Sequence, residues 1–72
     1  MRYTNSDIGQ VEYSVVQDIE LNGVQFEVGD VITLSDITEK AGGTVIYTFA
    51  NDNGSFTIAE SELGLAGEFE EV

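Results

Sequence analysis

Carboxylates are the only side chains that this sequence offers in quantity for chemistry. The 72 residues carry fourteen Asp and Glu against two cations, Arg2 and Lys40, which gives a formal net charge of -12. There is no His to act as a general base, and no Cys to act as a nucleophile, a zinc ligand or a disulfide partner. Paired carboxylates can hydrolyse glycosides, but among fourteen acids such pairs arise by chance, and a chain this short has little room for a substrate cleft. We therefore expect neither enzymatic activity nor a cofactor.

One stretch around Gly54 has a spacing that approaches a calcium-binding EF-hand loop. With Gly54 at loop position six, Asn51 and Asn53 take positions three and five, and Glu60 takes position twelve. Position one then falls on Phe49, which cannot supply the carboxylate that this position requires. Asn53-Gly54 also fits a tight β-hairpin turn, and we prefer that interpretation. The sequence therefore predicts no dedicated metal site, although loose binding of divalent cations to clustered carboxylates stays open.

The negative charge argues against phosphate and membrane ligands. Neutralising nucleic-acid phosphates requires Lys and Arg, and neither Gly64 nor Gly67 is followed by the Lys-Ser or Lys-Thr of a phosphate-binding loop. No apolar run has the length of a membrane span, and the first ten residues contain no hydrophobic signal core. We therefore expect no direct nucleic-acid binding, no membrane partner and a cytoplasmic location.

The C-terminal segment concentrates the acids. Alternate residues on one face of a strand repeat at about 6.6 to 6.8 Å. Glu68 and Glu70 on a final strand, with Glu60 and Glu62 nearby in sequence, can therefore form one acidic strip. The predicted partner-binding residues are this segment's five acids and one acid in the hairpin turn: Glu60, Glu62, Glu68, Glu70, Glu71 and Asp52.

We expect the partner of this strip to be a protein with a basic surface. Twelve net charges match roughly 20 Å of duplex DNA, which carries one charge per about 1.7 Å of its axis. The sharper hypothesis is a nucleic-acid mimic that inhibits a host DNA- or RNA-binding protein by occupying its basic groove. The alternative is a small structural or assembly module, such as a virion or complex component, whose acidity serves only solubility. Such a module would associate through an exposed sheet edge or hydrophobic patch, and the sequence leaves self-association open.

The elements that must position these residues are strands. Apolar and polar residues alternate with period two from Val11 onward, most clearly over residues 24–28, 44–49 and 56–58. Asn22-Gly23 and Asn53-Gly54 favour the positive φ angles of type I′ hairpin turns. Five or six such strands predict a mainly β, single-domain antiparallel fold, either a small barrel or a bent sheet.

The remaining segments are predicted as follows. The chain turns at Gly29-Asp30, connects through a flexible or short helical stretch at 35–43, makes one turn over 59–65 and closes with a strand over 68–72. Residues 1–10 are expected to be irregular or flexible. The expected core aromatics are Phe26, Tyr47, Phe49 and Phe56. Tyr3 and Tyr13 either pack locally, which we prefer, or anchor a partner.

Residues 24–34, followed by 47–49 and 54–58, resemble the small SH3-like β-barrel pattern, in which an aromatic strand enters a Gly-Asp turn and a second strand before a hairpin. The resemblance covers roughly residues 24–60, and at this level the chain is also similar to small acidic bacteriophage proteins. It implies a barrel fold and, for a phage protein, the host cytoplasm. It implies no binding of proline-rich peptides, because that groove uses Trp and the chain has none.

The charge imbalance predicts that salt stabilises the fold. Sodium or magnesium salts screen repulsion between the acids, so the Tm should rise from low to moderate ionic strength. Thermal melts followed by circular dichroism measure this. A flat or falling Tm would show that repulsion does not limit stability.

Overall fold

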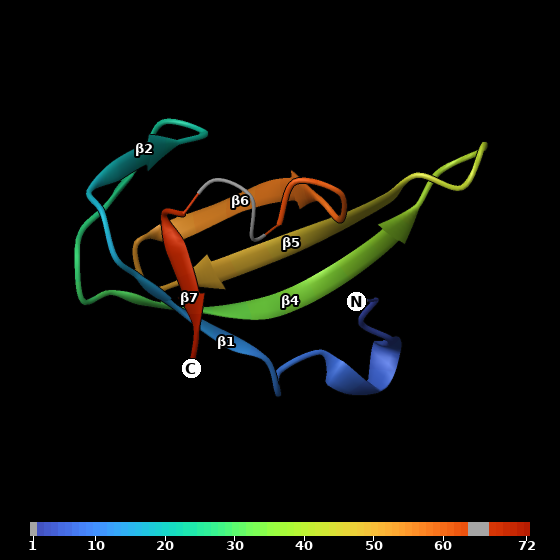
Figure 1. Cartoon of the computed structure of the whole chain (residues 1–72), viewed down its shortest axis with the longest axis horizontal. Helices are drawn as coiled ribbons and strands as arrows, with labels where there is room; N and C mark the ends of the chain where they lie inside the picture. The colour runs from blue at the N-terminus through green and yellow to red at the C-terminus, as the bar shows by residue number, and fades with distance from the viewer. Residues whose placement is uncertain (1, 64–66) are drawn as a thin grey trace.

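The computed structural model describes residues 2–63 and 67–72. These residues form seven strands and one 3-10 turn, joined by loops. The elements are η1 (Asn5–Asp7), β1 (Glu12–Val15), β2 (Ile19–Leu21), β3 (Val24–Phe26), β4 (Val31–Glu39), β5 (Val45–Asn51), β6 (Gly54–Ala59) and β7 (Phe69–Glu71). Five strands form an antiparallel sheet in the order β6-β5-β4-β1-β7, and β2 pairs with β3 in a separate ribbon (Figure 1). The predicted mainly β fold is thus confirmed, with one strand more than expected. No helix in these residues has the length and apolar character needed to cross a membrane.

The β2–β3 ribbon contains the type I′ turn that the sequence predicted. Asn22 and Gly23 have φ angles of 54° and 77°, and Leu21 pairs with Val24 on either side of them. Positive φ at both central residues matches the right-handed twist of the flanking strands, so this turn sets the register of the ribbon.

The β5–β6 hairpin is also confirmed, but its predicted turn is wrong by one residue. Asn51 pairs with Gly54, so the two loop residues are Asp52 and Asn53. Among the described non-glycine residues only Asn22 has a positive φ, so Asn53 does not adopt the type I′ conformation. Instead, the Asn51 side-chain Oδ1 accepts a hydrogen bond from the Asn53 N–H at 2.9 Å, and this local bond closes the turn.

Gly54 is required by packing between the two hairpins. Its φ is +154°, and a Cβ atom at this position would lie 2.7 Å from Cγ2 of Val24. The tip of the β2–β3 ribbon thus presses directly on the start of β6, where Asn22 Nδ2 also donates to the Ser55 carbonyl at 3.4 Å. Glycine is therefore needed at position 54 because of the contact with Val24, and not because Gly54 is a loop residue of the turn.

The predicted connection over 35–43 is wrong, because β4 continues to Glu39. The pairing of β4 with β5 shifts between Leu34 and Asp36, which leaves Ser35 as a bulge. The bulge puts Leu34 and Ile37, three residues apart, on the same face of the sheet. This spacing interrupts the period-two pattern, which is why the sequence did not indicate a strand. The actual connection is a short turn in which Lys40 N–H donates to the Thr44 carbonyl at 2.7 Å.

The N-terminal segment, which was expected to be irregular or flexible, contains one short regular element. Residues 2–10 contain η1, and the Tyr3 side chain is only 7% exposed in the core. At the other end, the expected closing strand is confirmed as β7, one residue shorter at each end. The chain turns over residues 60–63, where Leu63 N–H donates to the Ala59 carbonyl at 3.1 Å. Gly64 and Leu65, the end of the predicted turn, lie outside the described residues.

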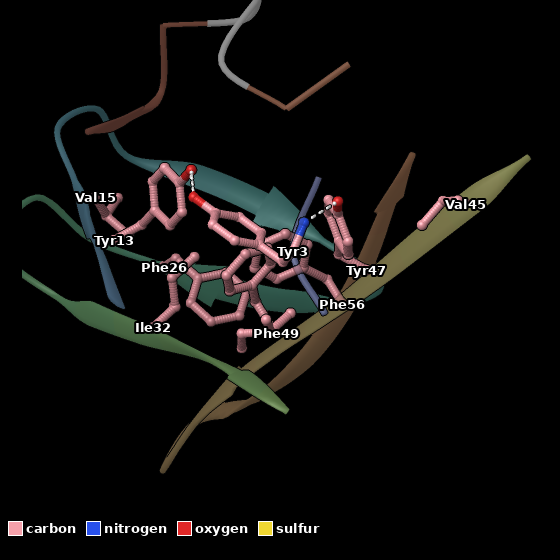
Figure 2. Close-up of a cluster of buried hydrophobic side chains, with 10 residues drawn as sticks. Tyr3, Tyr13, Val15, Phe26, Ile32, Val45, Tyr47, Phe49 and Phe56 are labelled. Carbon is pink, nitrogen blue, oxygen red and sulfur yellow. Dashed lines mark hydrogen bonds between the residues drawn. The ribbon is translucent and has the colours of Figure 1, made fainter. Parts of the chain in front are cut away.

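One aromatic core joins the sheet and the ribbon (Figure 2). The four predicted core aromatics are buried, and Tyr3 and Tyr13 are buried with them. The Phe56 ring lies 5.3 Å from the Phe26 ring of β3, 6.0 Å from the Phe49 ring of β5 and 5.4 Å from the Phe69 ring of β7. The ribbon therefore covers the inner face of the sheet, and the opposite face remains open to solvent.

A Gly54→Ala substitution should destabilise the fold by about 1 to 3 kcal/mol, because the new methyl group overlaps Val24. Urea denaturation measures the loss. In a Val24→Ala background the same substitution should cost less, since the clashing methyl groups are gone. Equal costs in both backgrounds would show that backbone strain, and not the contact, requires glycine here.

Candidate functional site

The fourteen acids divide into those that hold the fold together and those that do not. Within residues 2–63 and 67–72, no charged residue is buried. Five acids accept hydrogen bonds through their side chains: Asp7, Asp18, Asp30, Glu60 and Glu71. Glu39 forms only a long ion pair with Arg2, 3.8 Å between Nη1 and Oε2. The other eight make no side-chain hydrogen bond or ion pair in this part of the chain, and they are Glu12, Glu20, Glu27, Asp36, Asp52, Glu62, Glu68 and Glu70.

Glu60 belongs to a network that fastens the N-terminus to the sheet. The Tyr3 N–H donates to the Tyr47 hydroxyl (Figure 2), with 2.9 Å between the two atoms. That hydroxyl donates to Glu60 Oε2 at 2.8 Å. Arg2 Nε donates to the same Oε2 at 3.0 Å. The hydrogen bond from Arg2, followed by the one from Tyr47, lowers the pKa of Glu60. Burial raises the pKa of Tyr47, so its hydroxyl stays protonated and able to donate.

Glu71 is bound by a second tyrosine pair. The hydroxyls of Tyr3 and Tyr13 are joined by a hydrogen bond (Figure 2), with 2.7 Å between the oxygens, and the Tyr3 hydroxyl also donates to Glu71 Oε2 at 3.2 Å. Glu71 is opposite Tyr13 in the β1–β7 pairing and therefore points to the inner side of the sheet. Burial, and then the bond to Tyr13, raises the pKa of Tyr3. This pair joins the two ends of the chain.

The structure therefore separates the six predicted contact residues. Glu60 and Glu71 take part in the tyrosine networks. Asp52 lies at the tip of the β5–β6 hairpin, and Glu62 lies in the turn after β6. Only Glu68 and Glu70 occur together. Glu70 lies on β7 and faces away from Glu71 by strand alternation, and Glu68, directly before β7, continues the same alternation.

A surface around β1 and β7 joins these two acids to a third. Glu70 is opposite Ser14, and Glu12 lies two residues along β1 from Ser14 on the same outer face. The Val16 N–H donates to the Glu68 carbonyl at 2.8 Å, which brings Glu68 beside the end of β1. Glu12 and Glu70 are exposed and Glu68 is half-buried. Three carboxylates thus line one face without an intervening cation.

Exposed valines share this face. Val31 is opposite Ser14 on β4, and Val72 follows β7 beside Glu12, whose carbonyl accepts the Val72 N–H at 3.0 Å. Val16, Val31 and Val72 are 41%, 44% and 76% exposed. We call the whole surface the β1–β7 patch, and it consists of Glu12, Glu68, Glu70, Val16, Val31 and Val72. Exposed apolar side chains are thus interspersed with carboxylates on this face, and a protein partner can use both.

Sequence reasoning found two of these six residues, Glu68 and Glu70. The other four come from three separate segments, and only the pairing of β1 with both β4 and β7 brings them together. The alternation beyond Val11 indicated a strand, but it could not say which strands would be its neighbours. Predicting the other four residues would require the order and register of β4, β1 and β7, which the alternation of residues does not indicate.

The two cations lie away from the β1–β7 patch. Arg2 pairs with Glu60 and Glu39, and Lys40 lies in the β4–β5 turn with no ion pair in the described part of the chain. Two shallow pockets of about 220 and 310 Å³ flank this region and share Val45. No group of three or more acids converges as metal ligands in residues 2–63 and 67–72.

Replacing Glu60 should change how stability depends on pH. Because Arg2 and Tyr47 lower its pKa in the folded state, the unfolded state takes up a proton first as pH falls. The contribution of Glu60 is therefore complete at neutral pH and is lost as pH falls through the lowered pKa. Urea denaturation of wild type and Glu60→Gln between about pH 7 and pH 3 should show a gap that closes on acidification. Glu39→Gln is the control, and a Glu60→Gln gap independent of pH would contradict this role.

Comparisons of the chain with protein-family models, with curated proteins and with solved structures find no match. The resemblance to SH3-like barrels and to acidic phage proteins therefore stays a prediction. The candidate site depends on the geometry and charge of this chain alone.

Proposed function

We propose that the chain is a non-catalytic acidic interaction protein, and that its β1–β7 patch binds the basic groove of a DNA- or RNA-binding protein. The observation that carries the proposal is the cluster of Glu12, Glu68 and Glu70 on one sheet face, where no cation accompanies them. Leaving like charges side by side costs stability, and a partner that supplies Lys and Arg would remove that cost.

The charge density of the chain supports mimicry of a nucleic acid. A net charge of -12 over a longest dimension of 33 Å gives one charge per about 2.8 Å, against one per about 1.7 Å along duplex DNA. The exposed valines add apolar contact that a nucleic acid lacks, and such contact would slow dissociation. The proposal places the protein in the cytoplasm with its partner, which is the host cytoplasm if a phage encodes it.

The second candidate function is a small structural or assembly module. The observation that favours it is β6, an edge strand of the sheet without any charged residue. Salt distinguishes the two functions, since binding of a basic groove weakens as the charges are screened and uncharged assembly does not.

Charge reversal within the β1–β7 patch tests the proposal. The partner would be captured from a lysate of a candidate host at low salt, identified, purified and titrated calorimetrically. Glu68→Lys combined with Glu70→Lys should weaken binding by at least tenfold, about 1.4 kcal/mol, because two attractions to the basic partner are replaced by two repulsions. The partner should also release DNA or RNA when the wild-type chain is added.

A double variant at Glu20 and Glu27 is the matched control. Both residues are exposed acids whose side chains make no hydrogen bond in the described part of the chain, and they lie on and beside the β2–β3 ribbon. Their reversal changes the net charge by the same amount. Equal loss in both variants would mean that only total charge matters, and unchanged affinity at positions 68 and 70 with an unchanged circular dichroism spectrum would reject the patch.

A further inference from the structure

The two edges of the five-stranded sheet differ in charge and length. β7 has three residues, of which Glu70 and Glu71 are acidic, whereas β6 has six residues and contains neither a charge nor a proline. Proteins normally protect an exposed edge with charges, proline, a bulge or a short strand. β6 has none of the first three and is twice as long as β7. In a chain with fourteen acids this edge is exceptional.

Backbone groups on the outer side of β6 are available for pairing. The Glu60 N–H donates to the Val45 carbonyl at 2.9 Å, which makes Ile46 and Ala59 a non-hydrogen-bonded pair. The pattern alternates, so Ser55 and Thr57 also occupy non-hydrogen-bonded positions opposite β5. The N–H and C=O groups of Ser55, Thr57 and Ala59 therefore point away from β5, toward the open side of the edge strand.

Thr57 is the centre of this open stretch. The Ser55 carbonyl accepts a long bond of 3.4 Å from Asn22, and the Ala59 carbonyl accepts the N–H groups of Glu62 and Leu63. Neither backbone group of Thr57 has a partner in residues 2–63 and 67–72. A carbonyl group thus has a hydrogen-bond partner near each end of β6, whereas both backbone groups of Thr57 in the middle are free within the described residues.

We propose that β6 pairs in antiparallel fashion with β6 of a second copy of the chain, about a two-fold axis at Thr57. In this register Thr57 exchanges two hydrogen bonds with Thr57 of the second copy, and Ser55 lies opposite Ala59. The same contacts occur on both sides of the axis, so the interface closes as a symmetric dimer. The proposal is independent of the proposed function, and either can fail alone.

The side chains on this edge fit a second copy. Ser55, Thr57 and Ala59 are small and uncharged on the outer face, and the neighbouring outer positions of β5 are Ala50, Thr48 and Ile46. On the inner face, Phe56 would lie opposite Ile58 of the second copy and extend the apolar core. The acids that would repel a copy of the same charge lie elsewhere. Acids approach each other only at the two ends of the paired strands, where Asp52, just before β6, lies at the same end as Glu60 and Glu62, just after β6 of the second copy.

The mass of the chain in solution is the first test. Sedimentation equilibrium from about 10 μM to 1 mM, in about 0.5 M NaCl to screen the remaining repulsion, should approach twice the chain mass of 7.8 kDa. Thr57→Glu sets two like charges on the axis, and Thr57→Pro removes the central N–H while leaving the bonds to β5. Both variants should lose the dimer. A wild-type chain that remains a monomer over this range overturns the proposal.

Thr48→Glu is the matched control. Thr48 is opposite Thr57 on the same outer face, but it belongs to an interior strand. Its substitution should leave the dimer intact if the edge is the interface. Loss of the dimer in Thr48→Glu as well would indicate that sheet faces pack together, and it would overturn edge pairing.

Two further measurements identify the register. The Thr57 amide should exchange with solvent rapidly in dilute protein and slowly in concentrated protein, while the Phe56 amide is protected in both. Asp52→Lys sets a cation at each end of the paired strands, where Glu60 and Glu62 of the second copy lie, so the dimer dissociation constant should fall about tenfold. A rise instead would contradict the register, and it would favour a cationic strand of another protein as the occupant of the edge.

Discussion

The Phe56 ring is the contact on which both sheets depend. It packs on Phe26 of the ribbon, Phe49 of the neighbouring strand and Phe69 of the last strand, with ring centroids 5.3 to 6.0 Å apart. A chain of this size buries only about 60% of the surface that it exposes when unfolded, and it has no disulfide to compensate. Packing aromatic rings from three other strands, β3, β5 and β7, against the one ring of Phe56 is how this core holds the ribbon to the sheet. The close approach at Gly54, two residues before Phe56, follows from the same packing.

The charge imbalance explains why tyrosine hydroxyl groups, joined by the Arg2–Glu60 ion pair, fasten the chain ends. With two cations for fourteen acids, most carboxylates cannot be neutralised internally. Tyr47 and Tyr3 instead donate to Glu60 and Glu71, and neutral donors avoid the cost of burying a cation. Arg2 completes the first of these contacts at the surface. Of the eight acids whose side chains have no partner in the described residues, all but the half-buried Glu68 are exposed, and one group of the eight gathers on the outer face beside β1 and β7.

The sequence predicted elements where local chemistry decides them. Asn22-Gly23 fixed one turn, alternation revealed β5 and β6, and the four central aromatics were correctly assigned to the core. Predictions from the sequence were wrong where a non-local contact decides the structure. The bulge at Ser35 interrupts the alternation, so the second half of β4 was not predicted. Gly54 was assigned to the turn, whereas packing against Val24 explains it. The residues of the candidate site divide in the same way between local and non-local causes. Glu68 and Glu70 follow from alternation, whereas Glu12 and the valines join them only through strand order.

Strand order also separates two kinds of surface on the molecule. Because the sheet runs β6-β5-β4-β1-β7, the acidic residues of β1 and β7 lie at one edge, and the uncharged β5–β6 hairpin strands lie at the other. A copy of the chain meets least repulsion at the uncharged edge, whereas a basic protein is attracted to the acidic one. Pairing through β6 would leave both β1–β7 patches free at the far ends of a continuous sheet. Two patches on one rigid body can engage a repeated basic surface together, and the second contact then forms at high effective concentration. Self-association and binding of a basic partner are therefore compatible in this fold.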